Sequence, residues 1–178
     1  FYPGIDISYR PTDNIKLFAS WNMALRMPTF TDLYYKSPTI QGNVGLKPEK
    51  TQAFSIGANY RTYYFQSSLS SFYNKGKDMI YWVMYSADDI YHSANFELDN
   101  MGVELSSSID FRRLTNGKSW LQDLSINYAY IYQHRKDNEE IYKSSYGLEY
   151  LRHKLVARLN HRVWNKLAAN WAFRWQDR

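Results

Sequence analysis

Imidazole side chains are the first candidates for metal chemistry, and the four in this chain are dispersed along the sequence. No two of them show the short His-x-His or His-x-x-x-His spacing that brings two imidazoles to one metal ion. The neighbouring acids Asp88 and Asp89 are too few to form a Ca²⁺ site by themselves. We therefore expect no metal site, and solvated positions for His92, His134, His153 and His161.

The sequence shows no arrangement suited to covalent catalysis or phosphate transfer. It contains no cysteine, which excludes disulfides, zinc–thiolate sites and cysteine nucleophiles. It has neither a Gly-x-Ser-x-Gly motif nor a phosphate-binding glycine loop. Serines cluster at 67–71 and 106–108, where strand positions explain small polar residues. We expect no catalytic residue, no cofactor and no enzymatic activity.

Aromatic residues make up 18% of the 178 residues, with 17 Tyr and 6 Trp, which is more than a soluble core needs. Tyr and Trp favour places where one end of the side chain is apolar and the other is wet, such as a membrane interface. Aromatic rings can also stack on bases, but the period of two in these stripes favours an interfacial girdle. The net charge of +5 is scattered, so nucleic acid is not expected as a partner.

Alternation of apolar and polar residues with a period of two predicts β-strands along most of the chain. One predicted strand runs from Ile15 to Leu25. Eleven residues at about 3.3 Å each, tilted by about 45°, rise about 25 Å, which matches the apolar band of a bilayer. A second stripe is expected to face lipid, opposite Asp123, Ser125 and Asn127: Leu124, Ile126, Tyr128, Tyr130 and Tyr132.

The predicted connections alternate in length between about eight strands. Long loops are predicted at 26–51, near 85–95 and at 134–151, and shorter turns at 11–14, 61–64, 112–120 and 164–166. Alternate connections of a meander fall on the same edge, so all the long loops share one edge, as in outer-membrane barrels. The predicted fold class is all-β: a segment of an antiparallel up-and-down transmembrane β-barrel.

The first long loop carries two motifs that resemble a known family. An Arg-x-Pro-x-Phe-x-x-Leu-Tyr segment begins at Arg26, and an Asn-x-x-Leu-Lys-Pro-Glu-Lys segment begins at Asn43 and opens into a strand. In this order they resemble the C-terminal part of the barrel of TonB-dependent outer-membrane receptors. The Asn-x-Gly-Val-Glu-Leu segment from Asn100 is also similar to that family.

The resemblance implies a function for the intact protein. Such receptors import a bulky, scarce nutrient (a ferric siderophore, cobalamin or a glycan), and membrane lipid and lipopolysaccharide surround them. Their barrels have about 22 strands, and an N-terminal plug and a TonB box connect them to the TonB energy-coupling complex. We expect residues 1–178 to be a single barrel segment, without the plug, the TonB box or the closing strands.

The resemblance also implies ligand contacts in the extracellular loops. Aromatic faces with a few cations suit ferric chelates, corrinoids and glycans. The residues expected to make these contacts are Arg26, Phe30, Tyr34, Tyr35, Tyr81, Trp82 and Tyr85. The alternative is that Phe30, Leu33 and Tyr34 only pack the loop on itself. Two other classes stay open: a non-transporting outer-membrane barrel, enzymatic or adhesive, and a soluble β-meander that binds a polymer.

Overall fold

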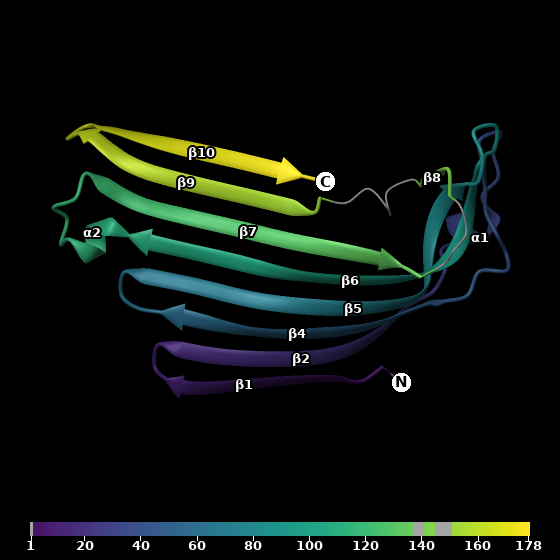
Figure 1. Cartoon of the computed structure of the whole chain (residues 1–178), viewed down its shortest axis with the longest axis horizontal. Coiled ribbons are helices and arrows are strands. Elements are labelled where there is room, and N and C mark those ends of the chain that lie inside the picture. Colours follow the sequence, from purple (N-terminus) through teal and green to yellow (C-terminus); the bar gives the residue numbers. More distant parts are fainter. Residues whose placement is uncertain (1, 137–140, 145–150) are drawn as a thin grey trace.

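The computed structural model describes residues 2–136, 141–144 and 151–178, and eight long antiparallel strands form one twisted sheet in chain order (Figure 1). Strands β1 and β10 lie at its two edges. This confirms the predicted fold class. The long strands are β1 (Gly4–Thr12), β2 (Ile15–Arg26), β4 (Glu49–Arg61), β5 (Phe65–Met84), β6 (Tyr91–Asp110), β7 (Leu121–Arg135), β9 (His153–Trp164) and β10 (Leu167–Asp177).

Four short elements lie in the connections. Strand β3 (Ile40–Gln41) pairs with β6 in parallel, which is an exception to the antiparallel pattern, and β8 (Lys143–Ser144) pairs with β5. The helices are α1 (Phe30–Tyr34) and α2 (Phe111–Leu114). Neither described helix has the length or apolar character needed to cross a membrane.

The strand register places apolar residues of all eight long strands on one face of the sheet. One complete row of directly paired residues crosses the sheet: Tyr9, Leu17, Ala58, Leu69, Leu105, Tyr128, Leu155 and Trp175. Tyr9 is 64% exposed and Leu69 51%, so no other part of the described chain covers this face. Lipid is the solvent that suits such a face.

The opposite face is mainly polar. A row of paired residues on this face reads Lys16, Asn59, Ser68, Ser106, Asn127, Val156 and Arg174. Ser106 Oγ donates a hydrogen bond of 2.8 Å to Asn127 Oδ1, and Ser20 and Ser55 bond across β2 and β4 at 2.6 Å. A Cβ at Gly57 would overlap the ring of Phe18, so this aromatic ring can lie on the polar face only over a glycine.

Buried apolar side chains occur at one end of the sheet, the end with the long connections. Among the described residues they are Leu46, Ile80, Val83, Phe96 and Leu98. The outer halves of β5 and β6 form the centre of this cluster. The loop 27–48 lies against them through hydrogen bonds such as Asn95 Nδ2 to the Lys47 carbonyl, and residue 142 bonds to Met84. The packed core therefore supports the loops, not the membrane-spanning part.

The second long loop, predicted near 85–95, is shorter in the structure than expected. Strand β5 continues to Met84 and β6 begins at Tyr91, which leaves a connection of residues 85–90. A bulge between Gly76 and Met79 inserts an extra residue in β5, and Asp78 there has a φ of 57°. The extra residue breaks the alternation from which the sequence argument recognises a strand.

The other connections agree better with the prediction. Strands β1 and β2 are joined by two residues, and Asn116 and Gly117 both have positive φ, at 51° and 79°, as an Asn-Gly turn requires. Strand β7 continues to Arg135, two residues into the third predicted loop at 134–151. Residues 137–140 and 145–150 of that loop lie outside the described residues.

The two faces lead to a direct test on neighbouring residues of β7. Ile126 lies on the apolar face, opposite Ala157, and Ser125 lies on the polar face, opposite Arg158. We expect Ile126→Arg to destabilise the folded barrel by about 2–4 kcal/mol, because lipid cannot solvate the charge, and Ser125→Arg to cost much less. Unfolding of the full-length protein in urea, in lipid vesicles, measures both. An equal loss of unfolding free energy in the two variants would contradict the assignment of Ile126 to the lipid-facing side and Ser125 to the opposite side.

Candidate functional site

An ion pair closes the base of the loop 27–48. Arg26 ends β2 and Glu49 begins β4, and the two residues are direct cross-strand neighbours. Arg26 Nε donates to Glu49 Oε2 at 2.7 Å, and Nη2 donates to Oε1. The backbone N–H of Ile80 donates to the same Oε1 at 2.8 Å. Glu49 is buried, with 7% of its surface exposed, so its carboxylate ties together β2, β4 and β5.

The first motif builds α1 next to this ion pair. Thr29 caps the helix: its Oγ1 accepts from Asp32 N–H at 3.1 Å, and Asp32 Oδ2 accepts from Thr29 N–H at 2.9 Å. This reciprocal capping box is what a Thr-x-x-Asp sequence favours at the start of a helix. Asp32 is buried, and Arg26 Nη1 lies 4.0 Å from its carboxylate. The motif therefore specifies a short helix held against the base of the loop.

Side chains of β6 hold the rest of the loop. Asn95 Oδ1 accepts from Lys47 N–H at 2.8 Å, and its Nδ2 donates to the carbonyls of Lys47 at 3.0 Å and Asp78 at 2.6 Å. Ser93 Oγ donates to the Asp32 carbonyl at 2.7 Å. We call Arg26, Asp32, Glu49, Ser93 and Asn95 the loop anchor. It fixes both motifs to the outer ends of β5 and β6.

The charges of the loop anchor stabilise each other. Burial alone would raise the pKa of Glu49, but the hydrogen bonds from Arg26 and Ile80 and the charge of Arg26 outweigh it, and the pKa lies below its ordinary value. The hydrogen bond to Glu49 likewise raises the pKa of Arg26. Both groups are therefore ionised at neutral pH.

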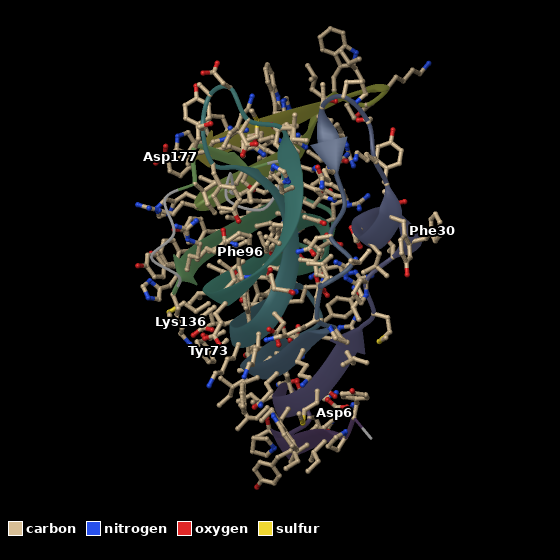
Figure 2. All side chains as sticks on the ribbon, turned by 90° about the vertical axis from the view of Figure 1, so that its right-hand side faces the viewer. Asp6, Phe30, Tyr73, Phe96, Lys136 and Asp177 are labelled. Carbon is tan, nitrogen blue, oxygen red and sulfur yellow. The ribbon has the colours of Figure 1, made fainter. Side chains whose placement is uncertain are left out.

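Three of the predicted ligand contacts lie together on α1 and directly after it. The rings of Phe30 and Tyr34 are 5.0 Å apart, and 77% and 58% of these residues are exposed. Tyr35 follows with 47% exposed. Figure 2 shows Phe30 pointing away from the sheet. Phe30 and Tyr34 thus contact each other but do not fill the interior of the loop.

The other predicted aromatic contacts come from the β5–β6 hairpin. Tyr81 and Trp82 lie in β5, not in a loop as expected, and Tyr85 lies in the connection. The Tyr81 ring lies 6.5 Å from Phe96, and burial raises the pKa of Tyr81. Tyr81 therefore belongs partly to the packed cluster. No ring contact in the described part of the chain joins this group to Phe30 and Tyr34.

The tip of the hairpin holds a second charged group. Asp89 Oδ1 lies 3.0 Å from His92 Nε2, and the backbone N–H groups of Tyr85 and Ile90 donate to the Asp89 carboxylate. The hydrogen bond to His92 is the main cause that lowers the pKa of Asp89. Within residues 2–136, 141–144 and 151–178, no three His, Asp or Glu side chains are placed to hold a metal ion.

Sequence reasoning missed two kinds of anchor residue. Glu49 was visible as part of the second motif, but its pairing with Arg26, 23 residues away, has no local signal. Ser93 and Asn95 carried no signal, because their segment was interpreted as the second long loop. Arg26, predicted as a ligand contact, has its charge neutralised by Glu49 while its side chain stays 50% exposed.

Removing the ion pair should loosen the loop. In the full-length protein we expect Arg26→Met to lower the local stability of loop 27–48 by about 1–2 kcal/mol. This is less than the roughly 3–5 kcal/mol of a fully buried pair, because Arg26 is half exposed. Hydrogen exchange at the Gly42 and Asn43 amides measures this. Lys36→Met is the matched control, since it removes a cation from the same loop but not from the pair. Unchanged exchange in Arg26→Met would contradict the anchor.

The same pair gives a pH dependence with a defined sign. The pKa of Glu49 is lower folded than unfolded, so its stabilisation is complete above the ordinary value of 4.5 and is lost as pH falls through the folded pKa. We expect protection of the loop amides to decrease below pH 4.5, and Glu49→Gln to flatten this dependence. If amide protection in Glu49→Gln depends on pH as it does in the unsubstituted protein, another group causes the transition.

Comparison with known proteins places the chain in a family. Residues 1–178 match the family model described as TonB dependent receptor-like, beta-barrel. The vitamin B12 transporter BtuB of Vibrio vulnificus (strain YJ016) is 29% identical over 100 residues, which are 56% of this chain and 16% of that protein.

Solved structures show the same fold. The copper transporter OprC superposes with a TM-score of 0.74 at 16% identity, over 96% of this chain and 25% of that chain. The siderophore receptor PirA from Pseudomonas aeruginosa superposes with a TM-score of 0.68 at 18% identity, over 96% of this chain and 29% of that chain. The chain thus spans less than a third of each of these proteins. The family match confirms the resemblance seen in the two motifs: the chain belongs to the TonB-dependent receptors of the outer membrane and forms part of their β-barrel.

Proposed function

We propose that the full-length protein binds a bulky, scarce nutrient at its extracellular loops and imports it into the periplasm, with energy from the TonB coupling complex. Family membership supports the receptor class. The similar proteins are named as a vitamin B12 transporter, a copper transporter and a siderophore receptor, so the family alone leaves the nutrient open. The loop 27–48, which contains α1, carries the side chains that narrow the choice of nutrient.

The exposed pair Phe30–Tyr34 is the observation that carries this proposal. Two adjacent aromatic rings that stay exposed on a well-anchored loop do not contribute to a packed core. An anchored loop loses little conformational freedom when a ligand binds, so more of the contact energy appears as affinity. The pair is therefore suited to stack against a flat or conjugated part of a ligand.

The unpaired charges of the same loop favour an anionic ligand. Arg26 is already paired with Glu49, so it adds little net charge. Lys36 and Lys47, on the same loop, are exposed and form no ion pair in the described part of the chain. Exposed aromatic rings and unpaired ammonium groups on one loop suit a negatively charged ferric chelate better than a neutral glycan.

Uptake measurements test this site in the full-length receptor. We expect Phe30→Ala with Tyr34→Ala to weaken binding of the transported nutrient about tenfold, because two aromatic contacts contribute roughly 0.5–1.5 kcal/mol each. The amount of barrel in the membrane should not change. Uptake of labelled cyanocobalamin and of a panel of ferric siderophores, with and without the coupling protein, provides the measurement.

Tyr63→Ala is the matched control. Tyr63 is similarly exposed, at 73%, but it lies in the short turn after β4, at the end of the sheet opposite to the long loops. It should leave uptake unchanged. If the double variant lowers the amount of barrel in step with uptake, the pair is structural. If uptake and affinity are unchanged, Phe30 and Tyr34 do not contact the nutrient.

A further inference from the structure

A hollow of about 510 Å³ lies on the polar face of the sheet, at the end away from the long loops. It extends between the turn that joins β1 to β2 and the turn that joins β4 to β5, which lie side by side at that end (Figure 1). The backbone N–H of Arg61 donates to the Asn14 carbonyl at 2.8 Å and connects the two turns. The volume is within the range of small-molecule sites, about 300–1,000 Å³.

Three cations from three neighbouring strands line this hollow: Arg10 of β1, Lys16 of β2 and Arg61 of β4. Lys16 is paired with Asn59 in the polar row, and Arg61 lies two residues after Asn59 on the same face. Arg10 follows Tyr9 of the apolar row and therefore points to the polar face as well. In the ranges that the structure describes, none of the three cations takes part in an ion pair.

The hollow has an excess of positive charge. Among the described residues, Asp13 is the acid that lines it. Asp110, at the end of β6, already lies 3.9 and 3.4 Å from the Nε atoms of Arg112 and Arg113, and Asp6 lies about 13 Å from Arg10 along β1. The neutral side chains that line the polar side of the hollow carry hydrogen-bond donors: Asn59, Gln66, Ser68 and Ser108.

These groups together are suited to bind an anion. Cations around a concavity in a low-dielectric wall focus the positive potential there. The guanidinium of Arg61 has the planar geometry that binds a carboxylate or a phosphate through two parallel hydrogen bonds. Amide and hydroxyl donors are available for the remaining oxygens of the anion. A bound anion also removes the mutual repulsion of the three cations.

The place of the hollow in the barrel follows from its face and its end of the sheet. The polar face lines the interior of an outer-membrane barrel, and the short turns lie on the periplasmic side. The hollow therefore lies at the periplasmic mouth of the interior. Lys16 and Arg26 are ten residues apart on β2, or about 33 Å along the strand. This separates the hollow from the exposed rings of Phe30 and Tyr34 on the loop 27–48.

We propose that this hollow binds a carboxylate or phosphate group and, in the full-length receptor, holds the anionic nutrient on its way from the barrel interior to the periplasm. The role in transport rests on the proposed function, in which the unpaired Lys36 and Lys47 favour an anionic ligand at the outer end. The binding of an anion in the hollow does not depend on that function. Exposed ion pairs contribute little free energy each, so the site is weak and releases its ligand readily.

A reporter cysteine at Ser68 tests anion binding in the purified full-length receptor. Ser68 lines the hollow without carrying a charge, and the 178 residues contain no native cysteine; any cysteine elsewhere in the receptor is first replaced by serine. We expect Ser68→Cys to react with an anionic methanethiosulfonate about tenfold faster than the same cysteine in the R10Q/K16Q/R61Q background, because three exposed ion pairs together contribute about this factor. Inorganic phosphate and citrate should each slow the reaction, and a cationic methanethiosulfonate should show no such preference.

The matched control is K154Q/R158Q/R174Q, which also removes two arginines and one lysine from the polar face, but from β9 and β10. It should leave the labelling of Ser68→Cys unchanged. Equal losses in both triple variants would show a bulk charge effect and overturn the site. Labelling that neither phosphate nor citrate slows would overturn it too. If neither reagent reacts with Ser68→Cys, another part of the receptor covers the hollow and the proposal is wrong. Heat-modified electrophoretic mobility confirms that each variant is folded.

Uptake into cells tests the role in transport, with a strongly anionic ferric tris-catecholate and a neutral ferric tris-hydroxamate as probes. We expect R10Q/K16Q/R61Q to slow uptake of the anionic chelate severalfold, with unchanged binding at the cell surface when the coupling protein is absent. Uptake of the neutral chelate should not change. Unchanged uptake of the anionic chelate, or equal losses for both chelates, would refute the role in transport. If the unsubstituted receptor imports neither chelate, the proposed function fails for this ligand class, while the cysteine labelling still decides whether the hollow binds an anion.

Discussion

The carboxylate of Glu49 is the interaction on which the outer end of the structure depends. It is buried where β2, β4 and β5 meet, and it receives two hydrogen bonds from Arg26 and one from the Ile80 amide. Burying this carboxylate without such partners would lower the free energy of unfolding by several kcal/mol. The folded chain must therefore hold Arg26 and the Ile80 amide in place around it. One acidic residue thus sets where the loop begins and ends and how it meets the β5–β6 hairpin.

The surroundings of the sheet differ between its membrane-spanning part and the end that carries the long loops. In the membrane-spanning part, one face is apolar and uncovered by protein, the other is polar, and lipid takes the place of a core. Beyond the bulge at Asp78, the same two strands pack against the loops, and Val83 and Phe96 are almost fully enclosed. In the membrane-spanning strands only alternate residues meet lipid. A mean hydropathy of −0.60 is therefore compatible with a membrane protein.

Prediction from sequence succeeded where one environment governs a whole strand. The stripe from Leu124 to Tyr132 alternates without interruption, and β7 has the expected faces. Prediction failed at the start of β6, which was expected in the long loop near 85–95, because this part of the strand packs against the loops and its burial has no period of two. At the site, the motifs indicated Phe30 and Tyr34, but the ion pair of Arg26 and the clamp of Asn95 join residues 23 and 48 positions apart. Such pairings follow from register, which a single sequence does not show.

The loop anchor also changes the role of Arg26, which its motif had indicated as a ligand contact. A guanidinium that already gives its hydrogen bonds to a buried carboxylate has little left to offer a ligand, and moving it would expose Glu49 to an uncompensated burial cost. Its contribution is to hold α1 so that Phe30 and Tyr34 stay exposed on a fixed support. Under the proposed function, binding then requires no ordering of the loop, and affinity comes from a few aromatic contacts. Under the proposed function, a change of these aromatic residues would leave the anchor intact and alter only the surface that meets the nutrient.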